Sequence, residues 1–363
     1  MREDFPIFDS KDFDPNFVYL DSAATMQKPQ AVIDAVSDFY KSSNANPLRG
    51  LYDLSVQATK ILDEARSTVA KFIGAESPKQ IIFTKNATEA LNLAALLLKQ
   101  QNKSAKVSAP LDLHHSALLP FAHHFKLDDS GEIALRSGMS NVTGEMPDFS
   151  SATVIDSAQE VVHRRIDVSK RPCDFLAFSG HKLGAELGIG VLYIREPDKY
   201  EPIFHGGEMV DYVEFKNGKA KEYYSESPAK FEAGTVNVAG ALSLKAAIDY
   251  LLEHDFDSLS GHATKLSDYT KELFNKIPEV KLYSAKNGIV SFNIEGVHPH
   301  DAAQVLAAHG IMVRAGYHCT QPFLEAMNWG PVLRTSFSFY NNEQEVEYLA
   351  EVVKTVRKEM GFS

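Results

Sequence analysis

Short apolar runs alternate with amphipathic stretches through the first two thirds of the chain. The runs that predict strands are Ile81–Thr84, Thr153–Ile155, Phe175–Phe178 and Ile189–Ile194. The stretches that predict helices are Pro29–Ser42, Ala87–Gln100 and Ala239–Glu253. Strands and helices in alternation are typical of an α/β fold. We therefore expect a large domain with a mixed, mainly parallel sheet flanked by helices.

The last third of the chain has a different pattern. It predicts two helices, Asp257–Lys276 and Asn342–Glu359, and three strands, Gly288–Ile294, Gly310–Arg314 and Val332–Phe339. This grouping indicates an α+β unit. We place the large domain at residues 14–249 and a smaller α+β domain at residues 250–363. We expect the N-terminal segment 1–13 to pack with the smaller domain.

Size, composition and charge indicate a soluble globular protein. The chain has 363 residues, of which 44% are hydrophobic and 23% are charged, which suffices for two domains. Its net charge of −11 argues against nucleic acid or an anionic membrane as a partner. No signal-like segment follows the charged start Met1–Asp4, and no apolar stretch approaches the length of a membrane span. Together with the presence of only two cysteines, this predicts a cytoplasmic protein whose thiols are buried or reactive.

A lysine and an aspartate follow two of the predicted strands. Lys182 ends the motif Ser179-Gly180-His181-Lys182, and Asp156 begins the motif Asp156-Ser157-Ala158-Gln159. A lysine can condense with an aldehyde and an acid can hold a pyridine nitrogen protonated, as pyridoxal 5'-phosphate (PLP) requires. Either motif alone is better explained by a surface lysine or an exposed aspartate. Together with the motifs below, they predict a PLP site in which Gln159 donates to the phenolic oxygen.

Further segments offer donors for a phosphate group. Asn86 is expected to cap the helix that begins at Ala87, with Glu89 completing a capping box. The free N–H groups and the helix dipole then favour an anion, and Thr88 adds a hydroxyl. A well-capped helix without a ligand is the simpler explanation of this segment by itself. Additional donors are expected from Ser179, His181 and Thr235, the last in the turn Phe231–Thr235.

The chain also contains two histidine pairs. One histidine of His114-His115 can stack on the cofactor ring and relay protons. The same pair could be drawn as a metal cluster with His123 and His124. However, no carboxylate lies at ligand spacing, and adjacent histidines point in different directions, so we expect no metal site.

Cys319 and Arg334 are candidates for chemistry on the substrate. Cys319 lies in a polar loop beside His318 and near Arg314, an environment that favours the thiolate. A free cysteine is otherwise usually part of the core, as we expect for Cys173. Arg334 interrupts an apolar strand, and its fork suits a substrate carboxylate. A buried structural salt bridge is the alternative.

Taken jointly, these motifs resemble the class V, fold-type I PLP enzymes. Within that class the chain is most similar to the SufS-type (group II) cysteine desulfurases, which overlap with the selenocysteine lyases. The matching segments occur in family order over nearly the whole chain. They are Tyr19–Ala24 with Gln27–Pro29, Phe83-Thr84 with Thr88–Ala90, His114-His115, Ser140–Val142 with Gly144, Asp156–Gln159, Ser179–Lys182, Gly188–Gly190, Phe231–Thr235, Arg314–Cys319 and Arg334.

The resemblance implies a role for each matching residue. The catalytic residues would be Lys182 as the Schiff-base lysine, His114 as the ring-stacking histidine, and Cys319 as the nucleophile that takes the sulfur. The other cofactor ligands would be Asp156, Gln159, Asn141, Thr88, Ser179, His181 and, from the second subunit of a homodimer, Thr235. The substrate-side residues would be Ala23, Asn141, Arg314 and Arg334.

The activity that the resemblance implies is the conversion of L-cysteine to L-alanine. The sulfur would pass to Cys319 as a persulfide, for iron–sulfur cluster assembly or other sulfur trafficking. Alternatives are a selenocysteine lyase acting on L-selenocysteine, another class V lyase, and a PLP-binding scaffold without turnover. His300 is expected to engage the sulfur acceptor, a zinc-containing, SufU-like protein. The plain alternative is a histidine at a helix start with no such role.

The chain departs from the family pattern in several places. Asn86-Ala87 replaces Gly-Thr, Leu113 replaces the glutamate before the histidine pair, and Gly184–Leu187 replaces a Tyr-Gly-Pro-Thr run. The interval from Asn141 to Asp156 is 15 residues, which leaves little room for the helix normally found there. We interpret this pattern as that of an active but specialised paralogue.

Overall fold

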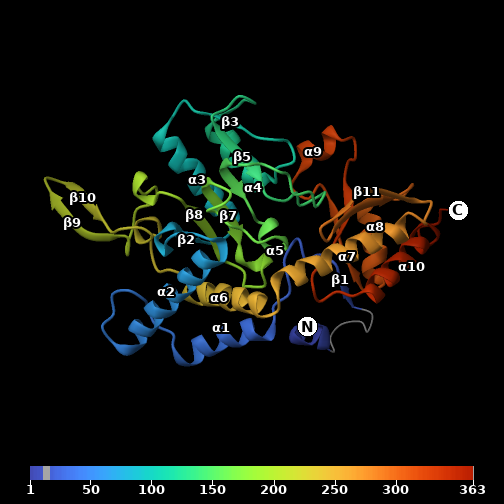
Figure 1. The fold of residues 1–363 in the computed structure, drawn as a ribbon, viewed down its shortest axis with the longest axis horizontal. Coiled ribbons are helices and arrows are strands. Elements are labelled where there is room, and N and C mark those ends of the chain that lie inside the picture. The colour runs from blue at the N-terminus through green and yellow to red at the C-terminus, as the bar shows by residue number, and fades with distance from the viewer. Residues whose placement is uncertain (11–16, 363) are drawn as a thin grey trace.

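The computed structural model describes residues 1–10 and 17–362 of the chain (Figure 1). These residues form a seven-stranded sheet, a four-stranded sheet and two two-stranded sheets. The helices are α1 (Gln30–Ser42), α2 (Asp53–Ile73), α3 (Ala87–Gln101), α4 (His115–His124), α5 (Glu160–His163), α6 (Val238–Glu253), α7 (Phe256–Phe274), α8 (Pro299–Ala308), α9 (Gln321–Ala326) and α10 (Glu343–Glu359). Short 3-10 turns span Arg2–Asp4, Pro6–Asp9, Pro78–Gln80, Gly180–Lys182, Pro197–Lys199 and Ala229–Phe231. In this part of the chain, no helix is long and apolar enough to span a bilayer.

The seven-stranded sheet is mixed and mainly parallel, as predicted. Its strand order is β2-β8-β7-β6-β5-β3-β4, and β8 runs antiparallel to both of its neighbours. The strands are β2 (Ile81–Thr84), β3 (Lys106–Ser108), β4 (Lys126–Leu127), β5 (Ile133–Ser137), β6 (Ala152–Asp156), β7 (Cys173–Ser179) and β8 (Gly190–Ile194). The four strands that the apolar runs predicted are therefore all present, within one or two residues.

Both faces of this sheet are buried, which explains why its strands are continuous apolar runs. In β7, Leu176 and Phe178 join a core with helices α2 and α6, whereas Phe175 and Ala177 join a core with α3 and α4 on the other face. Figure 1 shows α1, α2 and α6 below the strands of this sheet, whereas α3 and α4 overlap the strands in that view. The sheet is thus the middle of three layers.

The C-terminal third forms the second sheet. It is antiparallel, with the order β11-β12-β15-β14, from β11 (Val280–Lys286), β12 (Ile289–Ile294), β14 (Arg314–Gly316) and β15 (Val332–Ser336). Helices α7, α8 and α10 pack against it (Figure 1). Strand β1 (Val18–Tyr19) pairs with β13 (Ile311–Met312), and Val18 and Leu20 lie in the same core. A segment near the N-terminus therefore completes this unit.

The division into domains stays a prediction. Its boundary at residue 14 lies outside the described residues, and its boundary at residue 250 falls inside α6, which continues to Glu253. In the N-terminal segment, Arg2 donates to Glu345 of α10 and to the Tyr340 carbonyl. Phe5 contacts Tyr250 of α6 and Tyr340. The segment consequently touches both parts of the molecule.

Several local predictions were wrong. The predicted strand Gly310–Arg314 is two strands, because β13 pairs with β1 whereas β14 pairs with β15. The predicted strand Val332–Phe339 ends at Ser336. The predicted capping box of α3 is only half formed, since Glu89 accepts a hydrogen bond from the N–H of Lys85 rather than from that of Asn86.

Several elements were not predicted from the sequence, among them strands β3, β4, β5 and β11, helix α2 and a hairpin. Helix α2 has 21 residues. The hairpin of β9 (Val210–Lys216) and β10 (Lys219–Tyr224) projects from the body of the molecule (Figure 1). It carries the exposed side chains of Tyr212, Val213, Phe215 and Tyr223.

Candidate active site

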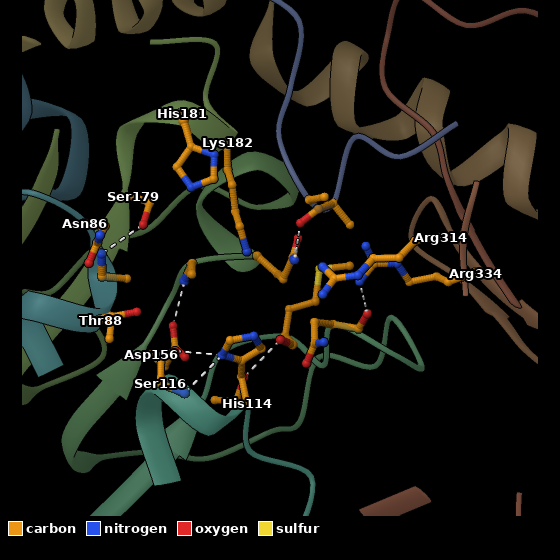
Figure 2. A pocket seen from close by; sticks show the side chains of 18 residues that line it. Asn86, Thr88, His114, Ser116, Asp156, Ser179, His181, Lys182, Arg314 and Arg334 are labelled. Carbon is orange, nitrogen blue, oxygen red and sulfur yellow. Dashed lines mark hydrogen bonds between the residues drawn. The ribbon is translucent and has the colours of Figure 1, made fainter. Parts of the chain in front are cut away.

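A cavity of about 230 Å³ lies where the carboxyl ends of β6 and β7 meet the start of α3. In a sheet of parallel strands, residues that follow neighbouring strands converge at one edge. Asp156 ends β6, Lys182 ends the turn after β7, and Asn86 caps α3. Figure 2 shows Asn86, Thr88 and Ser179 on one side, Arg314 and Arg334 on the other, and Lys182 between them.

The structure brings most of the predicted site residues to this cavity. Those that line it are Ala23, Thr88, His114, Asn141, Asp156, Gln159, Ser179, His181, Lys182, Arg314 and Arg334. Three predicted residues, Cys319, Thr235 and His300, are not among its lining. The sequence therefore predicted which residues gather here, whereas their roles stay a prediction.

Lys182 has the environment of a reactive amine. Burial lowers the pKa of Lys182 to about 8, and the carboxylate of Asp156 opposes this shift. Arg334 and Arg314 lower the pKa further through charge repulsion. Within the described residues Lys182 Nζ makes no hydrogen bond, and the lowered pKa means that more of the amine is neutral near pH 7 than in an ordinary lysine.

Asp156 is a buried carboxylate that requires a cationic partner. Its Oδ1 accepts the N–H of Ala158 at 3.0 Å. Burial raises the pKa of Asp156, and both that hydrogen bond and the charge of Lys182 counter the rise. Gln159 Nε2 donates to the Ala23 carbonyl at 2.8 Å, which fixes the amide at the cavity wall and leaves its second N–H available.

The start of α3 forms an anion-binding corner. Asn86 Oδ1 caps the helix by accepting the N–H of Glu89 at 2.9 Å, and Ser179 Oγ accepts the N–H of Ala87 at 2.8 Å. The exposed Thr88 adds its hydroxyl. His181 Nδ1 is buried without a hydrogen-bond partner in the described chain. Hydroxyls, an unpaired ring nitrogen and a helix N-terminus together suit a phosphate.

His114 is held as a neutral imidazole. Its Nδ1 accepts the N–H of Ser116 at 3.1 Å and lies 2.7 Å from Ser116 Oγ. Burial lowers the pKa of His114 to about 3, and the charge of Lys182 acts in the same direction. Because Nδ1 is an acceptor, the proton of the neutral ring is on Nε2.

The surroundings of Arg334 are consistent with both roles that the sequence left open, a substrate anchor and a buried structural salt bridge. It is almost fully buried and lines the cavity, yet Nη2 donates to Asp21 Oδ1 and Nη1 donates to the Asn141 carbonyl, each at 2.9 Å. The salt bridge with Asp21 is therefore present. Two of the five N–H groups are accounted for, and Nε has no partner among the described residues, so the guanidinium retains capacity for a further anion.

Cys319 lies beside the cavity rather than in its wall. It is half-buried, and Arg314 Nη2 lies 3.9 Å from its sulfur. Both His318 and Cys319 have positive φ, 49° and 58°, so the loop makes a tight left-handed turn that presents the thiol. His318 is directed elsewhere, since its Nε2 bonds the Val332 carbonyl and burial lowers its pKa to about 3. Of its two basic neighbours, only Arg314 offers positive charge to the sulfur.

The other predicted residues lie farther out. Thr235 is exposed on a turn whose Glu232 forms a buried bidentate pair with Arg66, at 2.7 and 2.8 Å. His300 is exposed at the start of α8, and a Cβ added at Gly316 of β14 would lie 3.8 Å from two atoms of its ring. Cys173 is buried in the core, and burial raises the pKa of its thiol to about 12, so the prediction that it is a core residue is confirmed.

Two residues that shape the site were missed. In the sequence, Asp21 stood out only as part of a segment that matches the family. Nothing in the neighbouring residues indicates that its carboxylate pairs with Arg334, which lies near the other end of the chain. Ser116 fixes the orientation of the His114 ring through a contact with its Nδ1. Its position two residues after the histidine, where a side chain can reach the ring, was the signal that could have revealed this role. No group of metal-ligating side chains forms in the described residues.

Comparison with known proteins places the chain in a family. The model of the aminotransferase class-V family matches residues 18–128 and 126–349, and the chain belongs to this family. A probable cysteine desulfurase of Halalkalibacterium halodurans is 36% identical, with 99% of this chain and 98% of that protein covered. A probable cysteine desulfurase of Vibrio cholerae is also 36% identical, with coverages of 97% and 96%.

Solved structures agree with this assignment. An apo structure of a cysteine desulfurase from Thermococcus onnurineus superposes with a TM-score of 0.90 at 33% identity, covering 99% of this chain and 97% of that chain. The cysteine desulfurase CsdA of Escherichia coli, in an S-sulfonic acid form, gives 0.89 at 30% identity, with coverages of 99% and 98%. The predicted fold class and family are thereby confirmed.

Proposed function

We propose that the protein is a PLP-dependent cysteine desulfurase that converts L-cysteine to L-alanine and receives the sulfur on Cys319. The observation that carries this proposal is one arrangement of side chains. Lys182, Asp156 and Arg334 line a single cavity, and Arg314 of the same cavity contacts the sulfur of Cys319. The relatives that bear the name cysteine desulfurase match the chain over nearly its full length.

The residues of the cavity fit PLP. The phosphate would lie at the start of α3 with Thr88, Ser179 and His181, where His181 Nδ1 lacks a partner in the described chain. Asp156 would hold the protonated pyridine nitrogen, and this contact would supply the positive charge that its buried carboxylate lacks. Gln159 and Asn141 would bind the ring substituents, with His114 against the ring face. Lys182 would form the covalent link.

When bound, PLP supplies an electron sink that stabilises negative charge at the substrate Cα. Lys182 moves the proton of that carbon, and its low pKa provides the neutral amine that this role needs. Arg334 binds the substrate carboxylate through its free N–H groups and thereby orients the side chain toward the Cys319 loop. His114, neutral with its proton on Nε2, is a donor within the cavity.

The transfer of sulfur to Cys319 needs no added oxidant, because the substrate carbon takes up the electron pair of the bond that breaks. The thiolate of Cys319 attacks the sulfur of cysteine, so that an S–S bond forms and the Cβ–S bond breaks with its electron pair going to carbon. The carbon then takes a proton and leaves as alanine, while Cys319 carries the persulfide. Arg314 stabilises the attacking thiolate from 3.9 Å.

A homodimer completes the proposed site. Thr235 is exposed and lies outside the cavity of its own chain, on a turn that the Arg66–Glu232 pair anchors. This exposure supports the proposal that Thr235 reaches a second subunit, where it would add a hydroxyl at the phosphate. The exposed apolar side chains of the β9–β10 hairpin are the kind that a dimer would cover.

The persulfide requires an acceptor. We propose a zinc-containing, SufU-like protein in the cytoplasm, engaged in part by His300, whose ring would contact a Cβ added at Gly316 in the strand that leads into the Cys319 loop. An exposed imidazole beside the sulfur-bearing loop can bind a metal through either ring nitrogen.

The purified protein with PLP and L-cysteine tests the function. Alanine and sulfide should form in equal amounts when a reductant is present, and Lys182→Ala should abolish both products together with the borohydride-reducible bond to PLP. Turnover of L-selenocysteine but not of L-cysteine would identify a selenocysteine lyase instead. PLP binding without turnover of either would identify a scaffold.

A further inference from the structure

A second, smaller cavity lies directly behind Lys182. Its volume is about 20 Å³, and it lies between α5, α7 and two chain segments around residues 22–26 and 337–339. Ala23, Gln159 and Lys182 line both this cavity and the larger one. The two cavities therefore share three side chains that we assign to the cofactor and the substrate.

Two residues that line the small cavity have buried polar atoms without partners. His163 Nδ1 and Ser338 Oγ are inaccessible to solvent, and neither has a hydrogen-bond partner in the described chain. The other lining side chains are mostly apolar, namely Met26, Val162, Leu259, Ala263, Phe337 and Phe339. A buried polar atom left unpaired costs about 1–3 kcal/mol, so such atoms are normally paired with each other or with water.

The cavity meets the physical requirements for one internal water molecule. A buried water molecule needs a cavity of roughly 10–15 Å³, counted as the space open to the centre of the water, and two to four polar partners. His163 and Ser338, which line the cavity, each have one unpaired polar atom, and Lys182, whose amine makes no hydrogen bond within the described residues, lines it as well. Apolar cavities stay empty, whereas this one has polar atoms on its wall.

His163 is held in one place by its surroundings. It lies one turn of α5 after Gln159, and a Cβ on Gly288 would come within 3.3 Å of its ring carbon Cε1. Burial lowers the pKa of His163 to about 4, and the charge of Lys182 adds to the shift. The ring is consequently neutral at pH 7, with one nitrogen that donates and one that accepts.

We propose that His163 is a positioning residue for Lys182, acting through an ordered water molecule that His163 and Ser338 bind in this cavity. The water gives the lysine amine a hydrogen-bond partner on the side away from the substrate. It thereby holds the amine in the orientation from which it reacts. Only the turnover arm of the test below rests on the proposed desulfurase function.

Three variants separate this role from a merely structural one. His163→Leu removes both ring nitrogens at similar volume. His163→Asn keeps a polar atom close to the position of Nδ1. Ser260→Ala is the matched control, because Ser260 lines the same cavity but its hydroxyl already donates to the Asp257 carbonyl at 3.1 Å.

The first measurement is the rate at which the apoprotein forms a borohydride-reducible bond with PLP at Lys182. His163→Leu should slow this rate about three- to tenfold, the equivalent of one hydrogen bond. His163→Asn should restore it to within about twofold, and Ser260→Ala should match the wild type. In turnover, kcat should follow the same order while KM for cysteine stays unchanged. Failure of turnover in every protein would refute the desulfurase function and leave the capture rates to decide this proposal.

The second measurement is a high-resolution crystal structure of the wild-type protein. Density for a water between His163 and Ser338 is expected, and it should be absent in His163→Leu. A dry cavity in the wild type would overturn the proposal. So would equal capture rates in the wild type and His163→Leu, or a His163→Asn variant as slow as His163→Leu at equal thermal stability.

Discussion

Replacing Arg334 with alanine would remove two things at once, a candidate substrate anchor and the partner of Asp21. Its guanidinium donates to Asp21 Oδ1 and to the Asn141 carbonyl, both at 2.9 Å, and is almost fully buried. Desolvation lowers the pKa of Arg334, opposed by the charge of Asp21, so the side chain depends on its anionic partners. The two losses have different magnitudes and different readouts.

Loss of the substrate contact should appear in KM. A charged, bidentate contact in a desolvated site contributes about 2–4 kcal/mol of binding. This corresponds to a KM for cysteine that is roughly 30- to 900-fold higher. Loss of the Asp21 partner should appear in stability. Breaking a buried pair costs about 3–5 kcal/mol, and we expect the lower end because the Asp21 side chain is 22% exposed and keeps some hydration.

Asp21→Asn is the control that distinguishes the two effects. It breaks the ion pair but leaves the arginine in place, so it should lower the unfolding temperature and change KM by less than about threefold. Arg334→Lys keeps the charge but not the fork, and it should restore stability more than KM. All variants should keep the absorbance of bound PLP.

The assays are steady-state alanine formation and thermal unfolding of the PLP-loaded protein. The reasoning is refuted if Arg334→Ala loses stability at an unchanged KM, since Arg334 would then be a structural residue only. Equal increases of KM in Arg334→Ala and Asp21→Asn would also contradict it, because the substrate contact belongs to the arginine alone.

Three further predictions concern the amine, the thiols and the acceptor. Because burial lowers the pKa of Lys182 to about 8, the neutral amine of the apoprotein, and with it the rate of PLP capture, should increase as pH rises through about 8 and then level off. An increase that continues to about pH 10 would show an unshifted lysine. Cys319→Ser should bind PLP and cysteine but form no persulfide and almost no alanine by mass spectrometry, whereas Cys173→Ser, in the core, should retain activity. Wild-type desulfuration by Cys319→Ser would remove the proposed mechanism. A zinc-containing acceptor should stimulate turnover, and His300→Ala should lose only that stimulation; equal stimulation of both proteins would argue against a role for His300.

The sequence alone determined much of the sheet and the cavity. The strands of the large sheet are apolar on both faces, so β6, β7 and β8 stand out from the polar segments around them. Residues that follow neighbouring parallel strands lie at the same edge of a sheet. The positions of Asp156 and Lys182 after two such strands therefore predict that their side chains lie close together. Where a function depends on short segments that follow a strand or begin a helix, local pattern is sufficient.

Helix α2 was missed although its buried side, with Ala58, Leu62, Val69 and Ile73 at helical spacing, carries an apolar stripe. Other elements were missed because they have no local signature. The β9–β10 hairpin is exposed on both faces, so no alternation of polar and apolar residues marks its strands. The strand predicted at Gly310–Arg314 is divided in two because β13 pairs with β1 whereas β14 pairs with β15. The residues of the segment itself do not indicate this change of partner.

Tertiary structure alone decided the pairings across the chain. Asp21 pairs with Arg334, Asn141 donates to the His318 carbonyl, and the His318 ring turns away to the Val332 carbonyl. Long-range contacts of this kind depend on how the two sheets are placed, and that placement is fixed by packing over the whole core rather than by any short segment. The sequence could therefore name the chemistry of the cavity, whereas its electrostatic partners and the small cavity behind Lys182 became visible only in the folded chain.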